Sequence, residues 1–138
     1  MSDAVPELDP SLQARLRSIP IFHLLPFELS EAEQGRAELA LPYKHEYDGI
    51  FDSLHGGFLM TLADTAACVA VLTLTGKDAM ITTTDMNIRF LSACRTKATA
   101  KAKVVKFGRS LVPVHVDIFD EKGTLVAISQ VTYMRLGK

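Results

Sequence analysis

A single acidic residue interrupts the most apolar segment of the chain. The segment from His55 to Leu74 reads HGGFLMTLADTAACVAVLTL, and Asp64 is its only acidic residue. A buried carboxylate is costly unless it is paired or hydrogen-bonded, and the segment has no Lys or Arg three or four residues away. Asp64 is therefore either a structural residue, bonded to the backbone, Thr61 or Thr65, or a tuned base or nucleophile.

Two glycines, Gly56 and Gly57, open the same segment and follow His55 directly. They are either ordinary turn residues or the start of a helix to which a ligand oxygen can come close. The free N–H groups and positive dipole of a helix start can form an oxyanion hole for acyl transfer. His55 then either orients the loop, touches the substrate, or is only structural.

The elements that would position these residues follow from periodicity. Leu12, Leu16 and Ile19 recur at helical spacing, which predicts a short amphipathic helix at about 10–19 that ends at Pro20. A long helix is expected from about Gly56 to Leu74, closed by Gly76. Strand patterns occur at 27–29, 35–41, 82–90, 97–104, 112–118 and 125–134, with a hairpin turn at 120–123.

This order of elements predicts one α+β domain that spans residues 1–138, with an antiparallel sheet around one long central helix. Alternation in the strand after the helix places Thr82, Met86 and Ile88 on one face, so Thr82 is expected to face the helix. A helix that is apolar nearly all round must be enclosed, and one curved sheet covers only part of it. A dimer is therefore expected.

Composition and charge narrow the classes of partner. The formal net charge is −1, which gives no reason to expect nucleic acid or an anionic membrane as a partner. Residues 86–116 contain no Asp or Glu but seven Lys or Arg, which is either a set of solvated strand faces or a positive surface for an anionic ligand. The acidic, proline-containing start is unlike a signal peptide, and the apolar segment carries a charge at its middle, so a cytoplasmic location is expected.

Other chemistries have little support. Cys68 and Cys94 do not form a disulfide framework, and the four histidines have no metal-ligand spacing with one another or with the cysteines. The sequence has no glycine-rich phosphate loop followed by Lys, and no nucleophile elbow.

Taken together, these motifs resemble the PaaI-type thioesterases of the hotdog superfamily. The match consists of His-Gly-Gly, six further residues, Asp and then Thr-Ala-Ala, followed by TTTDMNIRFL, FGRS and DEKGTLVAISQVTYM. It runs from about Asp48 to Met134. The resemblance implies a hotdog fold and hydrolysis of acyl-CoA thioesters without a metal or bound cofactor. It assigns the catalytic carboxylate to Asp64 and the thioester-polarising amide to Gly56, beside His55.

The resemblance adds further candidates and one departure. Thr82 falls at the position where some relatives have a serine or threonine that helps to bind the attacking water. The expected substrate contacts are Gly57, Cys68, Lys106, Gly108, Arg109 and Ser110, with Cys68 in the pocket wall and with Lys106 and Arg109 near the CoA phosphates. The family commonly has Asn six residues before the motif histidine and Gly three before it. Those positions are Gly49 and Asp52 here, and Asp48 would replace the Asn only after a one-residue shift.

The spacing of Gly56 and Asp64 predicts how the site is assembled. Eight residues on one helix correspond to about 12 Å, too far for both groups to act on one thioester. Two antiparallel helices across a two-fold axis would bring Asp64 of one chain to Gly56 of the other. A homodimer with shared sites is expected, and the resemblance implies a homotetramer.

Three alternatives remain open at this point. A hotdog hydratase or dehydratase would pair a His with an acid for proton transfer at carbon. A non-catalytic acyl-CoA sensor would need a DNA-binding domain, for which the residues before the motif leave too little room. A thioesterase that acts on a carrier protein would use the same site. The acyl group, aromatic or aliphatic, is not readable from the residues.

Overall fold

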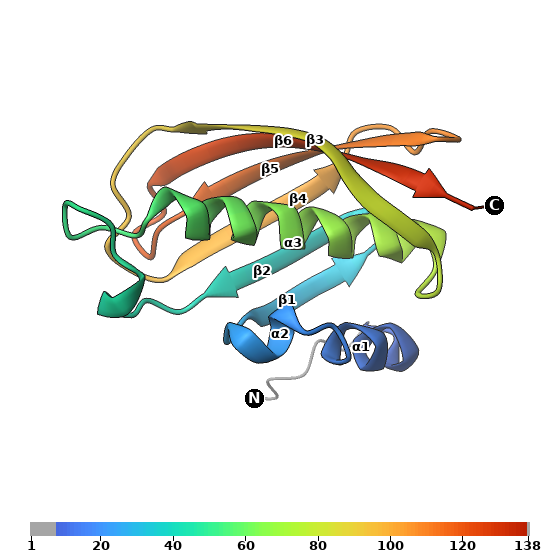
Figure 1. Cartoon of the computed structure of the whole chain (residues 1–138), viewed down its shortest axis with the longest axis horizontal. Coiled ribbons are helices and arrows are strands. Elements are labelled where there is room, and N and C mark those ends of the chain that lie inside the picture. Colours follow the sequence, from blue (N-terminus) through green and yellow to red (C-terminus); the bar gives the residue numbers. More distant parts are fainter. Residues whose placement is uncertain (1–7, 138) are drawn as a thin grey trace.

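A six-stranded antiparallel sheet curves around one long helix in the computed structural model, which describes residues 8–137 (Figure 1). The helices are α1 (Pro10–Arg17), α2 (Ile21–Leu24), the 3-10 turn η1 (His45–Tyr47) and α3 (Gly56–Thr75). The strands are β1 (Glu28–Glu33), β2 (Arg36–Leu41), β3 (Met80–Phe90), β4 (Ala98–Val104), β5 (Leu111–Phe119) and β6 (Leu125–Leu136). Their order in the sheet is β1-β2-β4-β5-β6-β3. The predicted antiparallel sheet around a single long helix is confirmed.

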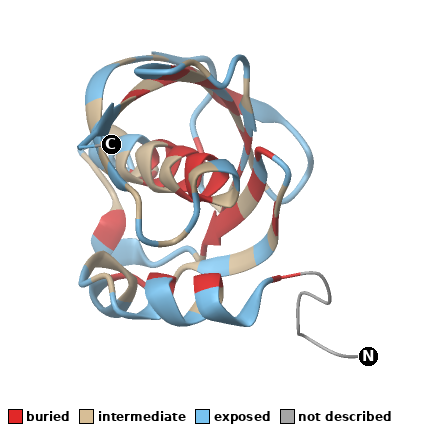
Figure 2. Ribbon diagram, turned by 90° about the vertical axis from the view of Figure 1, so that its right-hand side faces the viewer, coloured by how far each residue is buried: buried red, intermediate tan, exposed pale blue. Residues whose placement is uncertain are grey.

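The ends of α3 are set by two residues. His55 is the N-cap, and its ring accepts a hydrogen bond from the Gly57 amide. Gly76 ends the helix with φ +100°, a left-handed backbone conformation that favours glycine. Between them α3 is long and apolar enough to cross a membrane, a criterion that the buried core helix of a globular protein also meets. Here it lies inside the curve of the sheet (Figure 2).

Small side chains let α3 approach the sheet closely. The helix buries four alanines among its apolar residues, and the facing strand β4 buries Ala98, Ala100 and Ala102. The next strand, β5, turns Val112, Val114, Val116 and Ile118 inward, all of them fully buried. Each fully buried aliphatic side chain contributes about 1.5–3 kcal/mol to the hydrophobic stabilisation. This packing holds α3 in one place, so its polar side chains also have fixed positions.

Strand β3 changes face at a bulge, which corrects one sequence prediction. Its pairing with β6 shifts register between Thr83 and Asp85, so Thr84 is an extra residue in the strand. Met86 and Ile88 turn toward the core as predicted, but before the bulge Thr83 turns inward and Thr82 is exposed. The prediction that Thr82 faces the helix is therefore wrong, because a one-residue insertion moves every preceding side chain to the other face.

The N-terminal helices lie on the β1 side of the molecule in Figure 1, where α1 contacts α2 and α3. Asp9 caps α1 by accepting a hydrogen bond from the Ser11 amide, and Pro10 takes the first helical position, where no N–H is needed. The expected helix at about 10–19 is observed at Pro10–Arg17, and α2 was not predicted. The predicted domain of residues 1–138 includes 1–7 and 138, which lie outside the described residues.

Candidate active site

Asp64 lies in the middle of α3, partly buried, and its carboxylate is held by two hydroxyl groups. Thr83 Oγ1 and Tyr133 Oη each donate a hydrogen bond of 2.7 Å to Asp64 Oδ1. Thr61 and Thr65, the structural partners considered from the sequence, instead donate to backbone carbonyls of α3. The carboxylate is thus bonded to strands β3 and β6, and not to its own helix.

Thr83 and Tyr133 face each other directly in the β3–β6 ladder. Burial raises the pKa of the Tyr133 hydroxyl above its usual range, and the negative charges of Cys68 and Asp64 raise it further. Tyr133 therefore keeps its proton and remains a hydrogen-bond donor at neutral pH. Sequence reasoning missed both residues. A buried tyrosine needs a partner for its hydroxyl, and that requirement is the signal that could have identified Tyr133.

Cys68 lies one helical turn beyond Asp64 and is partly buried. Burial raises the pKa of its thiol to about 11. A hydrogen bond from Tyr133 lowers this pKa, and the negative charge of Asp64 raises it. A thiol in this state is a poor nucleophile at neutral pH. The geometry therefore favours the expected place of Cys68 in the wall of the site.

The start of α3 offers one unused amide. His55 Nδ1 accepts the Gly57 amide at 2.8 Å, which requires a ring with its proton on Nε2. The Gly56 amide, by contrast, donates to none of the residues that the structure describes. The Phe90 ring lies against Gly56, so that a Cβ at Gly56 would approach Phe90 Cζ to 2.9 Å. The amide predicted to bind the thioester oxygen is the one left free.

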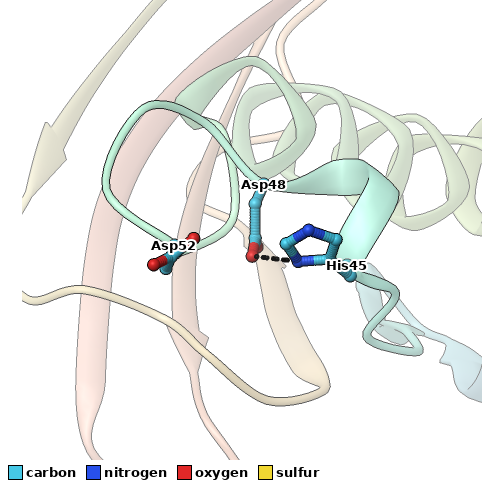
Figure 3. Close-up of side chains that lie close together, drawn as sticks. All are labelled: His45, Asp48 and Asp52. Atoms are coloured by element: carbon cyan, nitrogen blue, oxygen red, sulfur yellow. Dashed lines mark ion pairs between the residues drawn. The ribbon is translucent and has the colours of Figure 1, made fainter.

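The loop before α3 holds His45, Asp48 and Asp52 close together (Figure 3). Their ligand atoms lie within 4.8 Å of one another, which makes them the set in the described chain that could hold a metal ion. Residue spacing did not predict this cluster, because His45 and the two aspartates meet only through the fold of the loop. Asp48 Oδ2, however, already lies 3.3 Å from His45 Nδ1 and accepts the Tyr43 hydroxyl at 2.6 Å. These contacts stabilise the loop conformation without a bound metal ion.

Asp48 also affects the ionisation of Tyr43. Its hydrogen bond raises the pKa of the exposed Tyr43 to about 12. The side chain of Asp48 is 5% exposed, and its Oδ1 is buried without a hydrogen-bond partner in the described chain. Asp52, where the family commonly has Gly, adopts φ +53°, a left-handed backbone conformation that glycine tolerates more easily.

The loop between β4 and β5, residues 105–110, contains Lys106 and Arg109 and is called the basic loop here. It lies at the opposite end of α3. Gly108 and Ser110 are held by Arg135, which donates to their carbonyl oxygens through its guanidinium and its amide at 3.1 and 2.7 Å. The same guanidinium lies 4.4 Å from the centre of the Phe107 ring. Lys106 and Arg109 are exposed. Sequence reasoning did not identify Arg135, although it fixes the loop.

Cavities occur at both ends of the helix. One of about 520 Å³ is lined by Gly56, Leu59 and Phe90, among others, at the start of α3. Another of about 520 Å³ is lined by Thr75, Arg109 and Ser110 at its end. Asp64 lines neither of these two. The predicted site residues of one chain thus fall into separate groups along a helix of about 30 Å.

Two lysines of the positive surface have partners within the chain. Lys97 forms an ion pair with Glu28 at 2.8 Å, and Lys101 lies over the Phe119 ring. Lys97 lies directly before β4 and Lys101 lies on it, and such contacts are typical of lysines at a protein surface. Lys106 and Arg109 stay candidates for an anionic ligand, as do the other exposed basic residues of this window, Arg89, Arg95 and Lys103.

The sequence profile of the Thioesterase superfamily matches residues 51–127, which is more than half of the chain. The chain belongs to the thioesterase superfamily. It is 33% identical over 109 residues to a presumed esterase of Saccharolobus solfataricus, across 78% of this chain and 76% of that one. It is 27% identical over 106 residues to 1,4-dihydroxy-2-naphthoyl-CoA hydrolase of Listeria monocytogenes, across 76% and 86%.

Solved structures agree with the family. The phenylacetic acid degradation protein PaaI of Thermus thermophilus superposes with a TM-score of 0.77 at 25% identity, over 86% of this chain and all of that chain. The PaaI-like hotdog fold expected from the sequence is confirmed. Family membership supports thioester hydrolysis as the general chemistry of the chain.

Proposed function

We propose that the protein hydrolyses acyl-CoA thioesters to the free acid and CoA, with Asp64 as the catalytic carboxylate. One observation carries the proposal: α3 presents a partly buried carboxylate at its middle and a free amide, that of Gly56, at its start. An attacking group and an oxyanion donor are the two elements that acyl transfer requires. The Listeria relative is named as a CoA thioester hydrolase, which supports CoA as the leaving group.

The chemistry needs only these groups and water. Asp64 either takes a proton from water as its oxygen bonds to the thioester carbon, or bonds to that carbon itself. The Gly56 amide stabilises the negative charge that develops on the carbonyl oxygen. The C–S bond then breaks and the CoA thiolate leaves. On the general-base route the thiolate takes up the proton that Asp64 removed from water, and the free acid is formed directly. On the nucleophilic route an acyl–Asp64 anhydride remains, and water hydrolyses it to the free acid, restores Asp64 and supplies the proton of the thiol.

The site would be shared between two chains. β3 is 11 residues long and lies at one end of the strand order, with β6 as its one neighbour in the described sheet. A long unpaired edge is a template for pairing with another strand. Pairing of β3 with β3 of a second copy would set two α3 helices antiparallel, so that Asp64 of each chain meets Gly56 of the other. It would also bring Arg109 of one chain to the Gly56 end of its partner.

A panel of acyl-CoAs tests the proposal. Release of CoA is followed with a thiol reagent for aliphatic and aromatic acyl groups, and an enoyl-CoA is included to detect hydration instead of hydrolysis. The Asp64→Asn variant keeps the shape of the side chain and should lose at least ~10²-fold in kcat, the usual contribution of a positioned base.

The control is the folded state of the variant. Asn can still accept the Thr83 and Tyr133 hydroxyls, so the unfolding midpoint should stay close to that of the wild type. A purified Asp64→Asn protein that hydrolyses the best substrate at a near-normal rate would remove Asp64 from the mechanism. Turnover of the enoyl-CoA without thiol release would replace hydrolysis with hydration.

A further inference from the structure

The two carboxylate oxygens of Asp64 have different surroundings. Oδ1 accepts both hydroxyl groups, from Thr83 and from Tyr133, at 2.7 Å. Oδ2 accepts no hydrogen bond from the described residues and is not among the fully buried atoms that lack a partner, so it is at least partly exposed. The side chain is therefore held by one oxygen, and the other is free.

We infer that Tyr133 is a positioning residue that holds Asp64 with Oδ2 turned to the substrate, and that Oδ2 is the reacting atom. This inference rests on the proposed thioesterase function and deepens it. Tyr133 itself touches neither water nor thioester in this scheme; it acts only through Asp64.

The position of the Tyr133 hydroxyl explains how one contact can fix the carboxylate. Tyr133 Oη lies 2.7 Å from Asp64 Oδ1 and 3.0 Å from the backbone carbonyl oxygen of Asp64. Because it contacts both the side chain and the main chain of the same residue, it restricts rotation of Asp64 about its first side-chain bond. The shorter contact is to the charged oxygen, which is the stronger acceptor.

The hydroxyl is also a dependable donor. Burial keeps the pKa of Tyr133 above its usual range, so the hydroxyl retains its proton at neutral pH. Two donors on Oδ1 stabilise negative charge on that oxygen and make it the poorer base and nucleophile. If Asp64 acts as a base, the proton of water passes to Oδ2 and then to the departing CoA thiolate. If it acts as a nucleophile, Oδ2 forms the bond to carbon.

Tyr133→Phe removes only the hydroxyl and tests the inference. We expect kcat for the best acyl-CoA to fall about 10-fold, with KM changed less than about twofold, because a hydrogen bond to a charged group is lost and substrate contacts are kept. Combined with Asp64→Asn, the same change should have no further effect on the residual rate. Non-additivity of this kind separates a residue that acts through Asp64 from one that only supports the fold.

Ser129→Ala is the matched control. Ser129 is buried on β6, four residues before Tyr133, and its hydroxyl donates to the Asn87 carbonyl of β3 at 2.6 Å. The variant removes a buried hydroxyl that links the same two strands but lies away from Asp64. It should lose stability comparable to that of Tyr133→Phe while kcat is unchanged. Equal losses of kcat in the two variants, or an undiminished effect of Tyr133→Phe in the Asp64→Asn background, would overturn the positioning role.

The reacting oxygen is tested in a crystal structure of the wild type with an inert ketone analogue of the best acyl-CoA, in which CH2 replaces sulfur. Oδ2 should lie nearer than Oδ1 to the ketone carbon or to its bound water, and the reverse order would overturn the inference even if Tyr133→Phe failed to fold. If the wild type hydrolyses no thioester, the proposed function fails instead. The crystal structure of Tyr133→Phe alone then decides the positioning role: one unchanged Asp64 rotamer refutes it, and several rotamers support it.

Discussion

Thr83 lies directly opposite Tyr133 in the β3–β6 ladder, and the hydroxyls of both residues meet at the same oxygen of Asp64. The carboxylate on the helix is therefore set by the register of two strands that follow it in the chain. A slip of one residue between these strands would turn one of the hydroxyls to the outer face. The bulge at Thr84 is thus part of what positions the site.

The bulge gives a test with adjacent residues. Thr83→Val removes one hydroxyl from Asp64 Oδ1, and we expect a fall in kcat of about 10-fold, as for the loss of a hydrogen bond to a charged group. Thr82→Val alters an exposed side chain and should change stability by no more than about 0.5 kcal/mol, with kcat unaffected. Steady-state kinetics of both variants decide between the positions. A larger loss of kcat in Thr82→Val than in Thr83→Val would favour the orientation predicted from alternation, in which Thr82 faces the helix.

The sequence alone predicted the parts of the site that depend on helix periodicity. Asp64 and Gly56 stand out because one acidic residue and two glycines interrupt an apolar helix, and their eight-residue spacing is fixed by helix geometry. The partners of Asp64 depend instead on strand register. Three consecutive threonines carry no alternating signal that reveals a bulge. Alternation therefore predicted that Thr82 faces the helix, whereas Thr83 does.

Tyr133 was missed for a different reason. It lies 69 residues from Asp64, on a strand whose alternating pattern is common to many sheets. Only the tertiary packing of α3 against β6 shows which carboxylate satisfies its hydroxyl. Likewise, His45 and Asp52 meet Asp48 through the fold of a short loop, which residue spacing alone did not suggest.

The cap at His55 can be separated from any contact with substrate. His55→Ala removes the acceptor of the Gly57 amide and should destabilise the protein by about 1 kcal/mol, the usual value of an N-cap. It should also lower kcat/KM, because the Gly56 amide loses its fixed direction. His55→Asn retains a good cap and should recover both quantities. If urea unfolding shows that Asn recovers stability while kcat/KM stays low, the imidazole contacts the substrate directly.

The two thiols, one partly buried and one buried, should be unreactive in the native protein. Burial raises the pKa of Cys68 from 9.0 to about 11 and raises that of Cys94 as well. A shift of two units leaves about 100-fold less thiolate below pH 9, so Cys68 should react with Ellman's reagent at least ~100-fold more slowly at pH 8 than in denaturant. Because the unfolded thiol ionises first, stability should fall as the pH rises from 9 to 11. Rapid native labelling would show that the site is open to the reagent.

Ionic strength tests the basic loop. If Lys106 and Arg109 bind CoA phosphates, KM for an acyl-CoA should rise with salt, because exposed charges are screened. A matching acyl-pantetheine, which lacks the nucleotide, should show little salt effect. In the variant with Gln at both positions, the two substrates should respond alike. Equal salt dependence of both substrates in the wild type would show that Lys106 and Arg109 are solvated surface residues that do not bind the CoA phosphates.

The shared site is tested by mixing inactive chains. Asp64→Asn lacks the attacking group, and Gly56→Val places a side chain against Phe90 and over the free amide, so each homodimer should be inactive. In a mixed dimer one site carries both changes and the other carries neither. Random pairing makes half of the dimers mixed, so roughly a quarter of the wild-type activity should return on co-expression. If both groups came from one chain, every site would keep a defect. Mixed dimers confirmed by mass spectrometry but without activity would exclude the shared site.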